Sequence, residues 1–167
     1  MNEKLLQQYE TLMLKQNKNP DKDNKSLFNK IERANETFFE MQQKASQLEE
    51  EGSIDKAIEI YEKMISYATD LPGPYNRLAI FYRTQKRYHD EVRVLERAVY
   101  VYENVVFVHR TDRLKKLNMF KERLEKAKKL LHTSNESVQM ESERPWGKTS
   151  NRTFIANWLN WLKNLRQ

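Results

Sequence analysis

The chain has 167 residues, of which 38% are hydrophobic and 32% are charged, and its formal net charge is +6. This length is sufficient for one domain with a real core and modest extensions. With three glycines and four prolines, the sequence has too few turn residues for a sheet-rich fold. The absence of cysteine excludes disulfides, thiolate metal sites and cysteine nucleophiles. It also suits a reducing cytosol, so we expect a cytoplasmic protein.

The N-terminal residues contain acids and glutamines where a signal peptide has its apolar core. No apolar run approaches the ~20 residues that a membrane-spanning helix needs. We therefore expect no transmembrane segment. The basic balance permits nucleic acid or acidic proteins as partners without demanding either.

The first half of the chain alternates helical patterns with short breaks. Residues 1–16 read as a short helix, and a polar break around Pro20 closes an N-terminal segment, 1–25. A long helix follows from Ser26 to about Glu51, with Asn24 or Ser26 as its cap, and its early half should pack on the N-terminal helix.

Five further helices are predicted after the long helix. Gly52 ends the long helix, and Ser53 can cap the next one, 54–68. The prolines in 70–74 form a stop, and the later helices cover 75–86, 88–103 and Thr111 to about Leu131, with 104–109 read as a helix end. Together these make a helical domain at 26–132. Residues 133–150 are polar and aperiodic and predict a mobile linker, and 151–167 predict a short amphipathic helix.

The segments 41–64 and 75–98 align without a gap, at a constant spacing of about 34 residues. A period of this length with helical apolar spacing indicates helix pairs that stack on one another. An ordinary helical bundle whose spacing matches by chance is the alternative. The matched apolar positions are Met41 with Tyr75, Ala45 with Ala79, Leu48 with Tyr82, Tyr61 with Leu95, and Met64 with Ala98.

Both copies carry large, small and aromatic residues at the positions of a known repeat pattern. These are Met41, Ala45, Leu48, Gly52, Ala57 and Tyr61 in the first copy, and Tyr75, Leu78, Ala79, Tyr82, Leu95 and Ala98 in the second. The chain thereby resembles the tetratricopeptide repeat (TPR) family, with imperfect repeats at about 38–71 and 72–105. It departs from the family pattern at Lys44, Pro72, Lys86 and Glu91, and a Glu at a helix crossing must turn outward or find a partner.

The resemblance implies an all-α fold, a short TPR-like array with an N-terminal helical extension and a C-terminal capping helix. The segment 75–99 is also similar to segments of short bacterial TPR proteins, which suggests a bacterial origin. In this family, residues of the first helix of each pair line a groove that holds a peptide or a partner helix. Those positions fall here on Phe39, Gln42, Ser46, Asn76, Ile80, Arg83 and Thr84.

The predicted roles of the groove residues follow from their chemistry. The Asn76 amide can bind a peptide backbone, and the Arg83 guanidinium can bind a carboxylate with two parallel hydrogen bonds. Phe39 and Ile80 would form an apolar floor. The alternative is that the terminal helix of the chain fills this groove itself.

A second candidate is the basic segment 110–129, in which nine basic residues oppose three acidic ones. Such a helix can lie along phosphates, with Lys115, Lys126 and Lys129 as contacts. Its basic residues, however, surround the apolar stripe, and it lacks interleaved aromatic residues for stacking on bases. A solvated outer face is the alternative.

A third candidate is the apolar face of the C-terminal helix, which carries Phe154, Ile155, Trp158, Leu159, Trp161, Leu162 and Leu165. This face can dock on the same chain, insert into a partner, lie in a membrane interface or support self-association. The opposite side is mostly asparagine with few cations, which disfavours the membrane interface.

No enzyme motif is present: there is no glycine-rich phosphate loop and no pair of residues at metal-ligand spacing. The histidines His89, His109 and His132 lie far apart in the sequence. We therefore expect a non-catalytic protein–protein interaction module that needs no cofactor or metal. A nucleic-acid-binding accessory protein and a structural homo-oligomer remain the two alternatives.

Overall fold

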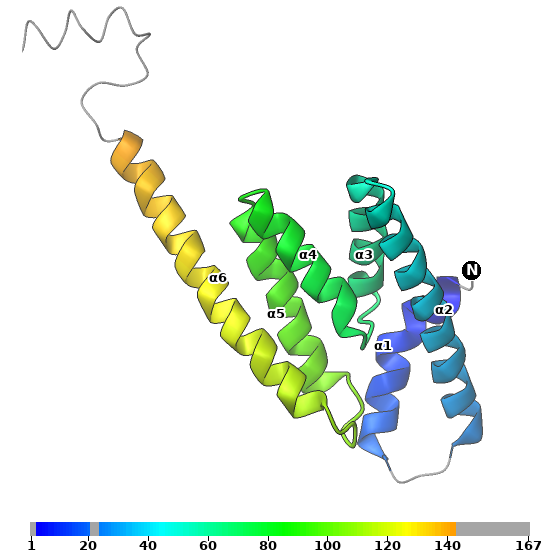
Figure 1. Cartoon of the computed structure of the whole chain (residues 1–167). Helices are drawn as coiled ribbons and strands as arrows, with labels where there is room; N and C mark the ends of the chain where they lie inside the picture. Colours follow the sequence, from blue (N-terminus) through cyan, green and yellow to red (C-terminus); the bar gives the residue numbers. More distant parts are fainter. Residues whose placement is uncertain (1–2, 21–23, 143–167) are drawn as a thin grey trace, which may run out of the picture. The chain divides into compact units, whose positions relative to one another are not determined.

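The computed structural model describes the backbone of residues 3–20 and 24–142 and the side chains up to Ser134. Within these ranges the chain forms α-helices and no strands, which confirms the all-α class (Figure 1). It divides into two units, Met1–Lys129 and Leu130–Gln167, and the core belongs to the first. The helices are α1 (Glu3–Lys18), α2 (Lys25–Glu50), α3 (Ile54–Ser66), α4 (Pro72–Thr84), α5 (Tyr88–Asn104) and α6 (Arg113–Ser142).

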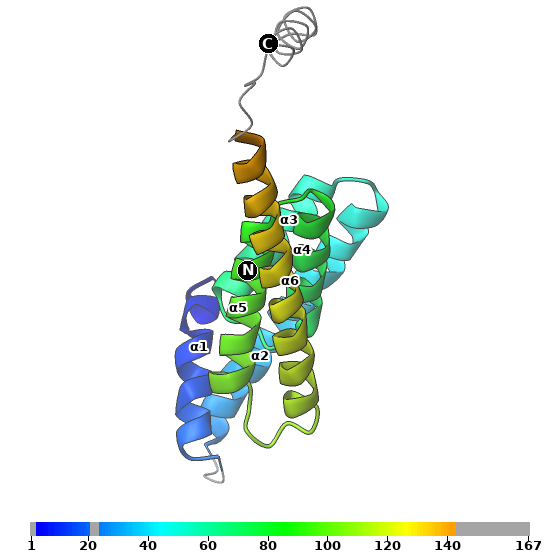
Figure 2. The same cartoon turned by 90° about the vertical axis from the view of Figure 1, so that its left-hand side faces the viewer.

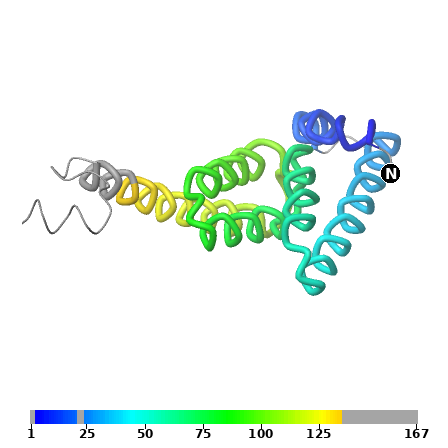
Figure 3. Tube along the Cα trace, turned by 90° about the horizontal axis from the view of Figure 1, so that it is seen from above, coloured from blue at the N-terminus to red at the C-terminus, as the bar shows by residue number. Residues whose placement is uncertain are grey.

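Two helical hairpins, α2–α3 and α4–α5, have the same turn geometry at the predicted spacing (Figure 3). At the first turn, the Ser53 N–H donates to the Leu48 carbonyl at 2.8 Å, and at the second, the Arg87 N–H donates to the Tyr82 carbonyl at 2.8 Å. Gly52 adopts a positive φ of 76°, and Lys86, its match in the second hairpin, adopts 58°. The sequence period is therefore also a period of the backbone.

Nine of the ten residues that the alignment pairs are buried in the core, and the tenth, Leu48, is partly buried. Met41 and Tyr75, Ala45 and Ala79, Tyr61 and Leu95, and Met64 and Ala98 are all buried. Two residues that depart from the repeat pattern differ in burial. Lys44 is exposed, although its match in the second hairpin, Leu78, is buried, whereas Glu91 is fully buried.

The N-terminal helix α1 packs on the first half of α2, as predicted (Figure 2). The rings of Tyr9 and Phe38 meet edge to face with centroids 5.0 Å apart, and the Tyr9 hydroxyl donates to Asn35 Oδ1. At its other end, α1 reaches the segment that follows α5. Asn17 Nδ2 donates to the carbonyls of residues 104, 105 and 106, and Asn17 Oδ1 accepts from the Val108 N–H.

The linker between the hairpins is held through its carbonyl groups. Tyr75 donates to the Thr69 carbonyl at 2.9 Å, and Tyr102 donates to the Asp70 carbonyl at 2.9 Å. Arg110 Nη1 donates to the same Asp70 carbonyl and also to the Asp70 carboxylate at 2.8 Å. Linker carbonyls that were buried without these donors would be unsatisfied acceptors. The side chains of Tyr75, Tyr102 and Arg110 therefore fix where the second hairpin starts.

The start of α4 and the end of α6 differ most from the sequence predictions. The helix α4 begins at Pro72, because proline is tolerated in the first turn of a helix, where no N–H partner exists, so the predicted stop at 70–74 is partly helical. The helix α6 begins at Arg113 and continues to Ser142, through the first part of the predicted linker. No glycine or proline interrupts it before Pro145.

The first part of α6 covers the second hairpin. Its Phe120 ring lies 5.2 Å from the Tyr102 ring centroid and 6.0 Å from that of Tyr75, and all three side chains are fully buried. The segment 104–109 is predicted as a helix end, but α5 ends at Asn104 and the residues after it form turns, in which Val105 and Val106 are fully buried.

Replacement of Lys86 by glycine is expected to raise the free energy of unfolding by about 1 kcal/mol, because left-handed backbone is costly for a residue with a Cβ. The reciprocal change, Gly52→Ala, is expected to lower it by about 1 kcal/mol. A Cβ at Gly52 would meet nothing within 4 Å, so the effect reports the backbone alone. Urea unfolding followed by circular dichroism measures both, and a Lys86→Gly variant no more stable than the parent would contradict the prediction.

Candidate interaction surface

The helices α2 and α4 run in the same direction and contact each other through side chains. Gln42 lies against Gly73, and further along Arg77 Nε donates to Glu49 Oε1 at 3.1 Å. Helical spacing places Phe39 one turn before Gln42, and Asn76 and Ile80 in the turns that follow Gly73. We call the surface formed by Phe39, Gln42, Asn76, Ile80 and Arg83 the α2–α4 face.

Two large apolar side chains are exposed on this face. Phe39 is 55% exposed and Ile80 is 46% exposed. Between them lie the carboxamides of Gln42 and Asn76, which occupy equivalent positions of the two hairpins. Ser46, at the position equivalent to Ile80, is also exposed. The face therefore offers apolar contact together with hydrogen-bonding groups.

The Arg83 side chain binds a carboxylate of its own chain. Its Nη2 lies 2.5 Å from Glu91 Oε1, and its Nε donates to Glu91 Oε2 at 3.1 Å. Glu91 is fully buried. This glutamate, which departs from the repeat pattern, therefore remains inward at the helix crossing and has Arg83 as its partner. The Arg83 side chain is still 42% exposed. The Thr84 hydroxyl is also engaged, since it donates to the Ile80 carbonyl.

The Asn76 side chain contacts α6. Its Oδ1 accepts a hydrogen bond from Arg123 Nη1, whereas its Nδ2 makes no hydrogen bond within the described residues. Burial lowers the pKa of the Arg123 guanidinium, and repulsion by Arg83 adds to this shift, while attraction by Glu91 opposes it. We call Asn76, Arg83, Glu91 and Arg123 the two-arginine cluster.

Sequence reasoning found two members of this cluster and missed the roles of the other two. Arg83 and Asn76 were predicted as groove residues, and both lie on the α2–α4 face. Glu91 was noted only as a departure from the repeat pattern, and Arg123 only as one of nine basic residues. The contact between Asn76 and Arg123 spans 47 positions, and no local pattern indicates it.

Most of the basic residues between 110 and 129 help to hold α6 and the segment before it in place. Five of the nine make such contacts: Arg110 with Asp70 and Asp112, Arg113 with the Glu103 carbonyl, Lys121 with Glu103, Arg123 with Asn76, and Lys128 with Glu96. The predicted phosphate contacts Lys115, Lys126 and Lys129 are all exposed. On the helix, however, Glu122 falls between Lys115 and Lys126 on the same side, which interrupts the positive stripe.

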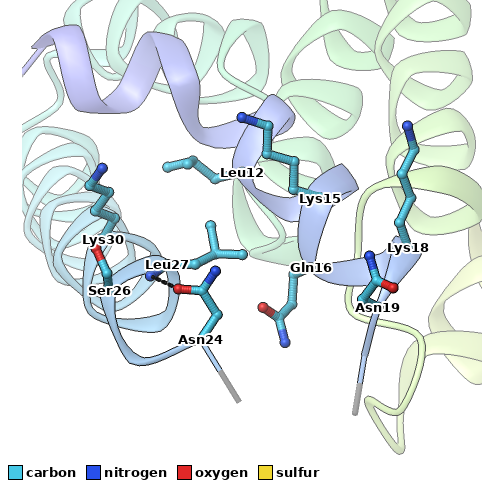
Figure 4. Close-up of a pocket in the computed structure, with 9 residues that line it drawn as sticks. All are labelled: Leu12, Lys15, Gln16, Lys18, Asn19, Asn24, Ser26, Leu27 and Lys30. Carbon is cyan, nitrogen blue, oxygen red and sulfur yellow. Dashed lines mark hydrogen bonds between the residues drawn. The ribbon is translucent and has the colours of Figure 1, made fainter. Parts of the chain in front are cut away.

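A cavity of about 360 Å³ lies between α1 and the start of α2 (Figure 4). The amino groups of Lys15, Lys18 and Lys30 lie well apart from one another in this view and do not converge on a common point. The Asn24 side chain accepts a hydrogen bond from the Leu27 N–H and thereby caps α2, as predicted. By contrast, Ser53 occupies the cap position of α3 without a side-chain hydrogen bond there. The cavity lining is Leu12, Lys15, Gln16, Lys18, Asn19, Asn24, Ser26, Leu27 and Lys30.

The described part of the chain has no group of three or more His, Asp or Glu residues that could hold a metal ion. Nor does any described helix combine the length and apolar character needed to cross a membrane. The predicted C-terminal apolar face, Phe154, Trp158, Trp161, Leu162 and Leu165, lies outside the described residues. Comparisons of the chain with protein-family models, curated proteins and solved structures find no match.

The Arg83–Glu91 pair is expected to show strong energetic coupling. Arg83→Met should lower the free energy of unfolding by about 3 kcal/mol, because it leaves a buried carboxylate without its counter-charge. Adding Glu91→Leu should recover most of this loss, which gives a coupling energy of about 2 kcal/mol in a double-mutant cycle. The control cycle is the exposed pair Arg87–Asp90, for which about 0.5 kcal/mol is expected. Equal coupling in the two cycles would contradict the burial argument.

The basic residues of the segment 110–129 should divide into structural and surface groups. Arg110→Gln is expected to lower the free energy of unfolding by about 2 kcal/mol, since it removes charged hydrogen bonds to the linker. Lys115→Gln, at an exposed site on α6, is expected to change it by less than about 0.5 kcal/mol. Thermal or urea unfolding distinguishes the two, and similar effects would show that Arg110 is only a surface cation.

Proposed function

We propose that the chain is a non-catalytic interaction module, built as a short TPR-like array, that binds a segment of another protein along the α2–α4 face. The proposal includes a cytoplasmic location, because a chain without cysteine suits a reducing compartment. The observation that carries the proposal is the composition of the face. It combines the exposed side chains of Phe39 and Ile80 with two carboxamides at equivalent positions of the two hairpins.

The TPR-like part of the proposal is supported by the repetition of backbone detail. The helices α2 and α4 end at matched positions of the alignment, Glu50 and Thr84, and α3 and α5 begin at matched positions, Ile54 and Tyr88. The turns between them share the same hydrogen bonds and the same positive φ. Repeated hairpins of this kind stack and leave the first helix of each pair on one side, where a partner segment can lie.

The binding mode follows from the chemistry of the face. An apolar side chain of the partner can contact Phe39 or Ile80 and remove their surface from water. The Asn76 Nδ2 can donate to a backbone carbonyl of the partner, and Gln42 Nε2 can do the same one hairpin away, whereas Gln42 Oε1 is buried. The affinity for the partner would therefore come from apolar contact. The two carboxamides would set the position of the partner backbone along the face.

The nucleic-acid alternative is less well supported by the contacts of the segment 110–129. Five of its nine basic residues bind groups of the same chain through the contacts given above, and Glu122 interrupts the positive stripe. Phosphate binding through the exposed lysines Lys115, Lys126 and Lys129 would lack a continuous positive surface. The homo-oligomer alternative depends on residues 151–167, which lie outside the described structure.

A photo-crosslinking amino acid placed at Phe39 or Ile80 tests the proposed face directly. In nuclease-treated host lysate, both positions are expected to capture the same protein, identified by mass spectrometry. The control position is Tyr100 on α5, which is 40% exposed and should not capture it. Asn76→Ala should reduce capture from Phe39 about fivefold, because it removes one hydrogen bond to the partner.

The alternatives predict other outcomes of the same experiment. Equal capture from Tyr100 would contradict binding at the α2–α4 face. Capture of a second copy of the chain would favour the homo-oligomer. Retention of nucleic acid without nuclease, lost when Lys115, Lys126 and Lys129 are replaced by Glu, would favour the nucleic-acid alternative.

A further inference from the structure

The two-arginine cluster holds two positive charges and one negative charge. Both oxygens of the Glu91 carboxylate contact Arg83, at 2.5 Å from Nη2 and 3.1 Å from Nε. The Arg123 guanidinium binds the neutral Asn76 side chain and no carboxylate within the described residues. One positive charge of the cluster therefore has no counter-charge in it.

Most other partly buried arginines of the described chain are compensated by a carboxylate. Arg77 pairs with Glu49, Arg97 with Glu10 and Arg110 with Asp70, whereas Arg113 donates only to the Glu103 carbonyl within the described residues. Arg123 is also partly buried, but its environment disfavours the charged form: burial lowers its pKa, and the neighbouring Arg83 adds to the shift. Such a site gains when a further negative charge arrives, because that charge offsets both the burial and the repulsion.

The surroundings favour an anion of a particular kind. The helix α4 contains no acidic residue, and the only carboxylate in the cluster is already bound by Arg83. The exposed Ile80 lies one turn before Arg83 and Thr84, so an apolar contact is available beside the charge. A single uncompensated positive charge matches one carboxylate, whereas a phosphate dianion would leave a net negative charge at a partly buried site.

We propose that the two-arginine cluster binds a side-chain carboxylate, the Asp or Glu of a protein segment whose neighbouring apolar residue contacts Ile80. Arg83 and Arg123 contact this carboxylate from α4 and α6, while Glu91 keeps Arg83 in place from beneath. This inference rests on the proposed function, because the cluster shares Asn76 and Arg83 with the α2–α4 face. It adds the chemistry of the partner: an acidic residue next to an apolar one.

Arginine side-chain NMR of the full chain tests the inference. The probes are two capped peptides of Leu, Ala and Gln that differ only in one central residue, Glu or Gln. The Glu peptide is expected to shift the Nε–Hε signals of Arg83 and Arg123 and to bind about tenfold more tightly than the Gln peptide, since it adds a charged hydrogen bond. Acetate and inorganic phosphate, each at constant ionic strength, serve as the free-anion arms.

Variants test which arginine causes the preference for the Glu peptide over the Gln peptide. Arg123→Gln should remove the preference for the Glu peptide while the fold is kept, as checked by circular dichroism, and Arg123→Lys should restore part of it. Arg93→Gln, which removes a paired arginine on α5, is the matched control and should leave the preference unchanged. Arg83 is not replaced, because its loss would leave Glu91 buried without a partner.

Each other outcome overturns the inference. Equal binding of the two peptides, tighter binding of phosphate than of the Glu peptide, or no shift of the Arg83 and Arg123 signals at about 10 mM peptide would each do so. Shifts already present with acetate alone, with no added effect of the peptide, would identify an anion site without a peptide partner. If the crosslinked partner is captured equally by the parent and by Arg123→Gln, the carboxylate site is wrong while the proposed function stands.

Discussion

The Asp70 carbonyl is the acceptor on which the arrangement of the hairpins depends. It receives hydrogen bonds from Tyr102 on α5 and from Arg110 in the segment before α6, while the neighbouring Thr69 carbonyl is bound by Tyr75 on α4. A buried carbonyl without a donor is costly, so the linker, the second hairpin and the start of α6 have to assemble together. The Phe120 ring, between those of Tyr75 and Tyr102, extends the same junction into the apolar core. The α2–α4 face and the two-arginine cluster are positioned by this junction.

The parts of the fold that were predictable from sequence are those set by local rules. Apolar spacing and the repeat period indicated the helices of both hairpins, and Gly52 marked the first turn. The equivalent turn at Lys86 was recognised only through the alignment, because lysine gives no local sign of a left-handed backbone. The start of α4 was misplaced because the Pro-Gly-Pro run reads equally well as a stop or as a first helical turn.

The candidate site shows where sequence reasoning reaches its limit. Asn76 and Arg83 were found from repeat positions, yet their actual contacts, Arg123 and Glu91, come from other helices. Such pairs depend on how the hairpin closes and on where α6 packs, and neither periodicity nor composition contains that information. A buried glutamate in a repeat position for alanine was the one available signal. A residue of the wrong chemistry at a crowded crossing requires a partner, and the structure shows that this partner is Arg83.

Asn17 has a consequence for where the folding unit begins. A single carboxamide at the end of α1 binds three carbonyls and one N–H of the segment that leads from α5 to α6, 87 to 91 positions away. The repeat pattern begins only in α2, but the smallest piece able to fold cooperatively begins in α1. A fragment cut to the repeats alone would lose the Tyr9 ring from its core and release the segment before α6. The cooperative folding unit of a repeat protein therefore need not begin where its first repeat begins.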